Sequence, residues 1–158
     1  MGLLDKLSST VAQGVPGGLG QGLLGNLSEL TPGALTKEYG EYLMEGETIQ
    51  NGFKLVRDVV IFTDRRIIDI DKQGATGKKA RVDTIYLNSL IKVSCETAGF
   101  GLDDSEINIH YITSPYFRAT GGVSVAERKF EFPKRYNLQP LYCYLATIAY
   151  NNFLTINR

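Results

Sequence analysis

The chain has few side chains of the kinds that perform catalysis or bind metal ions. His110 is its single histidine, and Cys95 and Cys143 are its two cysteines. A nucleophile with its base, or a zinc site, needs such residues at a recognisable spacing, which these three lack. His110 lies in the alternating segment Ile107–Ile112, which predicts a half-buried residue on a strand. Both cysteines are expected to be small buried residues, and a disulfide between them is the less favoured alternative.

Two short segments have the composition of ligand-binding loops without the required spacing. Asp103, Asp104 and Glu106 form an acidic cluster. Calcium needs oxygen ligands at closely defined positions, so we expect a solvated hairpin tip instead. The segment Gly74–Lys79 carries two glycines and two lysines but does not precede a helix as a phosphate-binding loop would, so it is predicted to be a turn. We therefore expect no catalytic residue, no cofactor and no metal ion.

The length and charge of the chain indicate one ordinary domain. Its 158 residues suffice for a single packed core and a tail. Seventeen basic and seventeen acidic residues balance, so nucleic acid is not an expected partner. The sequence has neither a signal peptide nor an apolar run long enough to cross a membrane. These features predict a cytoplasmic protein, with peripheral contact at the inner face of the membrane as an alternative.

Residues 1–37 differ from the rest and are predicted to be a partly flexible N-terminal extension. Seven glycines lie between Gly14 and Gly33, which raises the entropic cost of a packed backbone. The segment Gly2–Ser8 recurs as Gly22–Ser28, and each copy has leucines at helical spacing. These stripes are predicted to dock on this domain or a neighbouring subunit, or to enter a bilayer interface. Their leucines are Leu3, Leu4, Leu7, Leu23, Leu24 and Leu27.

Residues 38–158 have the pattern of a mainly β domain. Short apolar segments between turn residues predict seven strands of a sandwich or barrel, over residues 48–56, 59–63, 66–71, 80–87, 91–96, 106–113 and 123–132. The Thr63–Arg66 link allows only a tight hairpin. Ile68 and Ile70 alternate with Asp69 and Asp71, which predicts one buried and one solvent-exposed side for the third strand.

Two helices complete the predicted fold. A short helix over residues 35–44 leads into the first strand. The last helix is expected to run from a cap at Asn137, with Pro140 in its first turn, to about Phe153. Leu141 and Leu145 lie on its apolar face, which would close one open end of a strongly bent sheet.

Seven strands followed by one helix is the plan of the pleckstrin-homology (PH) fold. Residues 54–79, KLVRDVVIFTDRRIIDIDKQGATGKK, resemble the bacterial PH domain family, as do Ser94–Phe100 and the opening MGLLDKL. The resemblance covers about residues 38–153. It implies a seven-stranded, partly open orthogonal barrel capped by the C-terminal helix, and homo-oligomers that can be ring-like. Phosphoinositide-binding relatives use a lysine in the first strand and a basic pair in the second. Lys54 fits the first element, but Val59–Phe62 replaces the basic pair, so no specific phosphoinositide binding is expected.

The sequence thus predicts a non-enzymatic PH-like module that self-assembles into a homo-oligomer and serves as an interaction or scaffold element. Its N-terminal leucine repeats would be a docking or membrane-touching element. Arg65 and Arg66 at a hairpin tip, and Tyr142 and Tyr150 on the last helix, are the predicted contacts with another copy or with a partner protein. The alternative is a monomeric adaptor that binds a partner peptide along an exposed strand edge.

Overall fold

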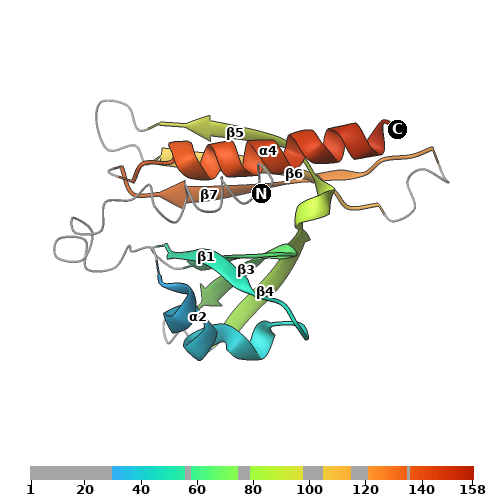
Figure 1. Ribbon diagram of the computed structural model, residues 1–158. Helices are drawn as coiled ribbons and strands as arrows, with labels where there is room; N and C mark the ends of the chain where they lie inside the picture. The colour runs from blue at the N-terminus through green and yellow to red at the C-terminus, as the bar shows by residue number, and fades with distance from the viewer. Residues whose placement is uncertain (1–29, 56–57, 75–78, 98–104, 115–120, 135) are drawn as a thin grey trace, which may run out of the picture. The chain divides into compact units, whose positions relative to one another are not determined.

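The computed structural model of the chain describes residues 30–55, 58–74, 79–97, 105–114, 121–134 and 136–158 (Figure 1). The chain divides into two compact units, and the division between them falls in the sequence after Leu87. The leucine repeats of the N-terminal extension lie outside the described residues.

The first unit is built on a four-stranded antiparallel sheet. Its strands follow one another in space as in sequence, in the order β1 (Ile49–Lys54), β2 (Asp58–Thr63), β3 (Arg66–Gln73) and β4 (Lys79–Tyr86). Two residues, Asp64 and Arg65, link β2 to β3, which confirms the predicted tight hairpin. Each strand begins and ends within two residues of its predicted bounds, because the turn residues between the apolar runs mark where pairing must stop.

A short helix covers one face of this sheet. Helix α2 (Pro32–Tyr39) begins after Thr31, whose side-chain oxygen accepts a hydrogen bond from the Ala34 amide, and the 3-10 turn η1 (Gly40–Tyr42) follows it. The helix starts three residues before the predicted position. Leu35 is fully buried in a cluster with Tyr39 of the same helix and with side chains of β1, β2 and β3, namely Ile49, Val59, Ile61, Ile68 and Ile70. The predicted boundary of the extension at residue 37 therefore falls inside a helix that belongs to this core.

Strand β3 is buried on both sides, which corrects the prediction of a solvent-exposed face. Ile68 and Ile70 belong to the cluster beneath α2, and Ile67 on the opposite face is also fully buried. Asp69 is only 4% exposed, while Asp71 is half-buried. The alternation of residue types in the sequence reported the two faces correctly. It could not report that a central strand, flanked by β2 and β4, is covered on both.

A buried ion pair joins the segment after η1 to the β2–β3 hairpin. The Arg66 guanidinium donates from Nε to Glu47 Oε1 at 2.8 Å and from Nη2 to Glu47 Oε2 at 2.9 Å. The Thr63 hydroxyl donates to Glu47 Oε1 at 2.7 Å, and the Met44 amide donates to Oε2 at 2.8 Å. Arg66 Nη1 donates to Thr84 Oγ1 at 2.9 Å. One arginine thus connects the carboxylate before β1 with strand β4.

The second unit contains a three-stranded antiparallel sheet and a long helix. After the 3-10 turn η2 (Leu87–Ser89), the strands β5 (Leu90–Glu96), β6 (Ser105–Ile112) and β7 (Val125–Phe132) pair in that order. Ile107 lies opposite Cys95 and Phe130, and Ile109 lies opposite Val93. Ile107, Ile109 and Phe130 are buried, so this face of the sheet forms the core of the unit.

Helix α4 (Gln139–Ile156) packs along β5 (Figure 1). It buries Leu141, Leu145 and Ala149, one residue per turn. Asn152 Nδ2 donates a hydrogen bond to the Leu90 carbonyl at 2.8 Å and fixes the far end of the helix to the start of β5. The helix begins two residues after the predicted cap at Asn137, whose side chain accepts a hydrogen bond from the Gln139 amide, and it continues three residues past Phe153.

The Glu47–Arg66 pair predicts a specific loss of stability in acid. Hydrogen bonding from Arg66, against the cost of burial, lowers the pKa of Glu47 from 4.5 to about 2. A pKa depressed in the folded state stabilises the fold above about pH 4.5, and this contribution of about 3 kcal/mol is lost as the pH falls through about 2. At neutral pH, Glu47→Gln leaves the Arg66 charge buried without its partner and should lower the free energy of unfolding by about 3–5 kcal/mol.

Urea denaturation at neutral pH and at steps down to about pH 2 measures both effects. The difference between wild type and Glu47→Gln should shrink as Glu47 becomes protonated. Glu45→Gln is the control, because this neighbouring glutamate is exposed and its loss should change stability by less than about 0.5 kcal/mol. A wild-type to Glu47→Gln difference that stays constant with pH would contradict the assignment.

Gly52 in β1 is predicted to be a position where a methyl group cannot be accommodated. A Cβ atom there would lie 2.6 Å from Leu35 Cδ1 and 3.1 Å from the Val60 carbonyl oxygen. Because Leu35 is fully buried, Gly52→Ala should lower the free energy of unfolding by about 1–3 kcal/mol. Gly33→Ala in α2 is the matched control, since no atom lies within 4 Å of its added Cβ and alanine favours a helix by up to about 1 kcal/mol. Equal urea midpoints for the two variants would refute close packing of α2 on β1.

Candidate functional site

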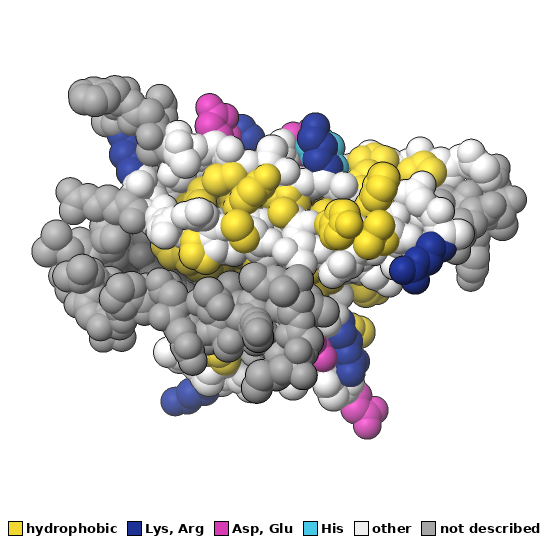
Figure 2. Space-filling view, turned by 45° about the horizontal axis from the view of Figure 1, so that its top comes forward, with side chains coloured by type: hydrophobic (Ala, Val, Ile, Leu, Met, Phe, Trp, Pro, Cys, Tyr) yellow, Lys and Arg dark blue, Asp and Glu magenta, His cyan; other side chains and the backbone are white. Residues whose placement is uncertain are grey.

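The outward face of α4 is apolar and carries no charge. None of the eighteen residues Gln139–Ile156 is lysine, arginine, aspartate or glutamate. Tyr150 is 62% exposed and Phe153 is 59% exposed, and Tyr142 and Leu154 are exposed as well. With the half-buried Ala146, these residues recur at helical spacing and form a stripe, here named the α4 apolar face. Figure 2 shows the hydrophobic side chains gathered along this region, with charged side chains only around its margin.

This face is unusual for a helix at a protein surface. A surface helix ordinarily has an apolar stripe towards the core and charged residues on the other side. Helix α4 already buries Leu141, Leu145 and Ala149 against its own unit, so the α4 apolar face is a second apolar stripe. Contiguous exposed apolar surface of this kind marks sites of interaction. The α4 apolar face is therefore the candidate functional surface of the described residues.

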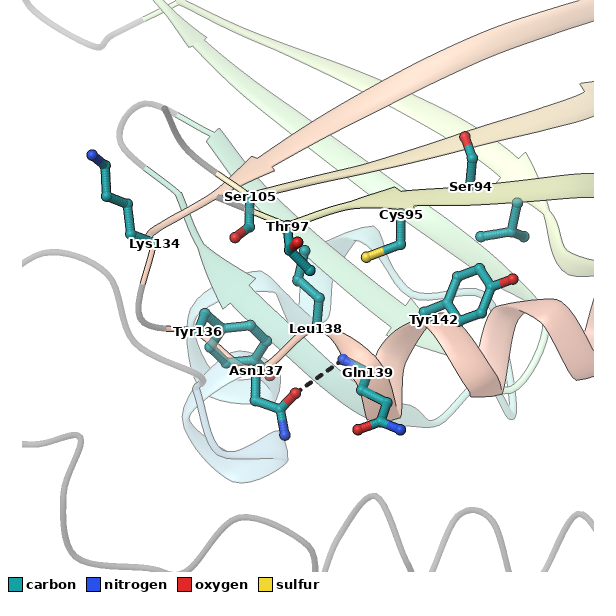
Figure 3. A pocket seen from close by; sticks show the side chains of 11 residues that line it. Ser94, Cys95, Thr97, Ser105, Lys134, Tyr136, Asn137, Leu138, Gln139 and Tyr142 are labelled. Carbon is teal, nitrogen blue, oxygen red and sulfur yellow. Dashed lines mark hydrogen bonds between the residues drawn. The ribbon is translucent and has the colours of Figure 1, made fainter. Parts of the chain in front are cut away.

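A pocket lies beside the start of α4. It has a volume of about 700 Å³ and is lined by β5, by the first residue of β6, by the segment before α4 and by the first turn of the helix. Cys95, Leu138 and Tyr142 surround its apolar part, while Ser105 and Thr97 contribute hydroxyl groups (Figure 3). Lys134 is the only charged side chain among the described residues that line the pocket, and it points away from Leu138 and Cys95 in this view. The described lining of the pocket is thus mixed in polarity and includes one cationic side chain.

The arrangement around Cys95 lacks the parts of a nucleophilic site. Burial raises the pKa of the Cys95 thiol, which favours the less reactive protonated form. Cys95 lies opposite Ile107, and His110 is three residues further along β6, so the histidine points to the other face of the sheet. Among the residues that the structure describes, no three histidine, cysteine, aspartate or glutamate side chains are grouped so that they could hold a metal ion.

His110 lies instead in a row of polar and charged side chains on the face of the β5–β6–β7 sheet opposite to Cys95 and Ile107. Its Nε2 atom is 3.6 Å from Glu127 Oε2, and the Asn108 amide nitrogen donates to the other oxygen of Glu127. Lys129 and Glu106 form a similar cross-strand pair at 2.8 Å. Such pairs between neighbouring strands are ordinary cross-strand contacts that stabilise a sheet.

Of the four residues predicted to form a contact surface, two lie on the α4 apolar face. These are Tyr142 and Tyr150. Arg65 is exposed at the hairpin tip, where its guanidinium donates to the carbonyl oxygens of Glu45 and Gly46 at 3.0 and 3.1 Å. The sequence predicted that Arg66 contacts another copy or a partner protein. Arg66 is instead buried and paired with Glu47 of its own chain, so it is not available to an acidic residue of another copy.

Helix α4 corrects the prediction for Cys143 and adds two exposed apolar residues to the predicted contact surface. Cys143 was expected to be buried, but it is exposed, because it lies about 200° around the helix from the buried Leu141. Phe153 and Leu154 were not among the predicted contact residues. The absence of charge over eighteen consecutive residues was the signal that could have identified them. Cys95 and Cys143 are both free thiols.

The sheet topology and the terminal helix agree with a family relationship. The family model described as bacterial PH domain matches residues 18–149. The chain belongs to the bacterial PH domain family. The protein YjqA of Bacillus subtilis (strain 168) is 49% identical over 88 residues, which are 56% of this chain and 70% of YjqA.

Solved structures of PH-domain proteins resemble the chain along most of its length. A DUF1696 family protein with a pleckstrin-homology domain from Shewanella loihica PV-4 superposes with a TM-score of 0.58 at 26% identity and covers 78% of this chain and 97% of its own. A pleckstrin-homology domain from Shewanella amazonensis SB2B gives a TM-score of 0.56 at 30% identity, with 77% and 90% covered. The predicted fold class, a mainly β PH-like fold of seven strands with a C-terminal helix, is thereby confirmed.

A third structure shows the same fold at lower identity. It is a bacterial protein containing a PH domain from Exiguobacterium sibiricum 255-15, with a TM-score of 0.60 at 20% identity. The match covers 80% of this chain and 63% of that protein.

No helix among the described residues has both the length and the apolar composition needed to span a membrane.

Proposed function

We propose that this bacterial PH domain is a non-enzymatic interaction module that associates with further copies of itself. The observation that carries the proposal is the α4 apolar face, on which two large aromatic side chains are more than half exposed. Covering the exposed parts of Tyr150 and Phe153 would contribute on the order of 2–3 kcal/mol. The net charge of zero means that copies of the chain do not repel one another.

The chemistry of the described residues supports a role without catalysis. The thiol beside the pocket is held in its protonated form and is separated from the single histidine by the thickness of a sheet. Glu47, a carboxylate whose pKa is lowered well below its usual range, is enclosed in an ion pair and is not among the residues that line the pocket beside α4. Aromatic side chains without nearby charge are, by contrast, typical of the centre of a protein–protein interface.

A second candidate function is binding of an extended partner peptide along β5. Strand β5 is at the edge of its sheet, and the pocket of about 700 Å³ lies beside it. An added strand would receive backbone hydrogen bonds from β5 and could place one side chain between Leu138 and Tyr142. An adaptor of this kind works as a monomer, so the mass of the protein in solution separates the two functions.

Charge introduced on the α4 apolar face should prevent self-association. Tyr150→Glu and Phe153→Glu each place a carboxylate where we expect an apolar contact, and each should weaken association at least tenfold. Asn151→Glu is the matched control, because Asn151 is exposed on the same turn but lies about 100° away from Tyr150. Light scattering after gel filtration measures the molar mass of the wild type and the three variants.

The control variant should keep the mass of the wild type, while the other two shift towards the monomer of 17.5 kDa. An unchanged mass for both Tyr150→Glu and Phe153→Glu would show that α4 is not the contact. A wild type that is itself a monomer would favour the peptide adaptor.

We further propose that the N-terminal leucine repeats give the module a weak peripheral attachment to membranes. Only one lysine, Lys6, lies before residue 37, so binding should depend on apolar contact and should be equal for neutral and anionic vesicles. Replacing Leu23, Leu24 and Leu27 by serine in the full chain should reduce flotation with vesicles. The same replacement of Leu3, Leu4 and Leu7 tests the first repeat. Wild-type protein that does not float, or variants that float equally well, would end this proposal.

A further inference from the structure

The pocket beside the start of α4 is large enough for a small organic molecule. Its volume of about 700 Å³ lies within the range of roughly 300–1,000 Å³ that is usual for ligand sites. The described residues that line it lie between Val93 and Tyr142 in the chain, so they all belong to the second unit. A ligand would therefore bind within one unit of a single copy of the chain.

The segment that forms one wall of the pocket is held in place by contacts of its own. The ring of Tyr136 stacks on Phe132, with 5.7 Å between the ring centroids and 22° between the ring planes. The Tyr136 amide donates to the Pro133 carbonyl at 2.9 Å, and the Gln139 amide donates to Asn137 Oδ1 at 3.2 Å. These contacts fix the chain between β7 and α4. The pocket is thus preformed, as ligand sites usually are.

The lining changes from cationic and polar at one end to apolar at the other. Lys134 lies at one end, and the hydroxyl groups of Thr97 and Ser105 lie between it and Cys95 in the view of Figure 3. Cys95 and Tyr142 lie towards the other end in the same view. A molecule that matches this gradient has a polar head and an apolar tail.

The charges near the pocket favour a head that is an anion. Lys134 is exposed, and its flexible four-carbon stem lets the ammonium group move towards a bound anion. The next residue in the sequence, Arg135, is a second cation. The carboxylates at this end of the sheet are on the face opposite to Cys95, where they form the cross-strand row Glu96, Glu106 and Glu131.

The apolar end of the pocket suits an uncharged tail. Burial raises the pKa of the Cys95 thiol, so this group is protonated and uncharged at neutral pH. Leu138 is only 3% exposed and is held between the sheet and the helix, while Tyr142 is 36% exposed and has surface that a ligand can cover. Each methylene group buried here would strengthen binding by up to about fourfold.

We propose that this pocket binds a small amphiphilic anion, with its head at Lys134 and its unbranched apolar tail between Leu138 and Tyr142. The head is a carboxylate or a phosphate, the chemistry that fatty acids and alkyl phosphates share. This inference does not depend on self-association. The ligand would fill the space that the second candidate function gives to a peptide side chain, so the two would compete.

The two cysteines report where such a molecule binds. Cys95 lines the pocket, whereas Cys143 is exposed and lies about 20° around the helix from Tyr150, on the α4 apolar face. Decanoate, kept below its micelle concentration, is the probe for the full-length chain. It should slow the reaction of Cys95 with N-ethylmaleimide at least fivefold and should leave the reaction of Cys143 no slower. Mass spectrometry of the digested protein measures the two rates separately.

Other probes with tails of similar length test the choice of head. Decyl phosphate in place of decanoate identifies the preferred anion, which is the one that protects Cys95 at the lower concentration. Decanol and decyltrimethylammonium, which are neutral and cationic, should protect Cys95 at least tenfold less well. Octanoate has two methylene groups fewer than decanoate, so about tenfold more of it should be needed.

Reversing the charge at Lys134 tests the position of the head. Lys134→Glu should weaken protection by decanoate at least tenfold and should let decyltrimethylammonium protect Cys95 instead, since the head then meets the opposite charge. Lys92→Glu is the matched control. Lys92 is also an exposed lysine of the second unit, but it lies opposite His110 on the other face of the sheet, so this variant should behave as the wild type does.

Protection of Cys95 alone, with a preference for anions that reverses in Lys134→Glu, supports the inference. Three results would overturn it: no protection of Cys95 at millimolar decanoate, equal slowing at Cys95 and Cys143, or protection by decanoate that Lys134→Glu leaves unchanged. Equal slowing would show that the probe only adheres to apolar surface. Each of these failures leaves the proposed self-association standing, because the molar mass of the protein without any ligand decides that question.

Discussion

The structure of the first unit depends on the burial of one carboxylate and one guanidinium. Taking two charges out of water costs several kcal/mol, which their attraction roughly balances only when every polar atom has a partner. Glu47 and Arg66 meet this condition through Thr63, Met44 and Thr84. We infer that the pair selects one arrangement of the segment before β1, the β2–β3 hairpin and β4, since another arrangement would leave a buried charge unpaired. The outer strand of the sheet is thereby held in a fixed register and shape.

The second unit has an exposed surface that suits contact with another protein chain. The second unit places its core beneath Leu141, Leu145 and Ala149 and still has an uncharged, aromatic outer face on the same helix. Glu47, whose pKa is lowered well below its usual range, forms an ion pair that stabilises the fold. Burial raises the pKa of the Cys95 thiol near the pocket and makes it less reactive. Fold alone does not assign a function, so we infer self-association from these particular side chains.

Most of the fold could be predicted from the sequence, because turn residues separate the apolar runs and the apolar residues change from strand spacing to helical spacing before α4. The burial of Asp69 could not, since alternation identifies the faces of a strand but not the elements that cover them. The role of Arg66 was hidden for a similar reason: Glu47 is nineteen residues earlier in the chain, and no local pattern links the two. Tyr142 and Tyr150 were predicted as contact residues because the tyrosines of the last helix cannot all face one core, and outward-facing aromatic side chains suit a contact between subunits. Leu35 shows the opposite error, where a composition boundary was placed inside a packed helix.

We infer that the apolar, uncharged face of α4, which is exposed on a single copy, is covered by a second copy when the protein self-associates. Sedimentation equilibrium of the unmodified full-length chain, repeated over a wide range of micromolar concentrations, tests this claim most directly. The account predicts a molar mass that approaches a whole-number multiple of 17.5 kDa as the concentration rises. A mass that stays at 17.5 kDa throughout that range would contradict it.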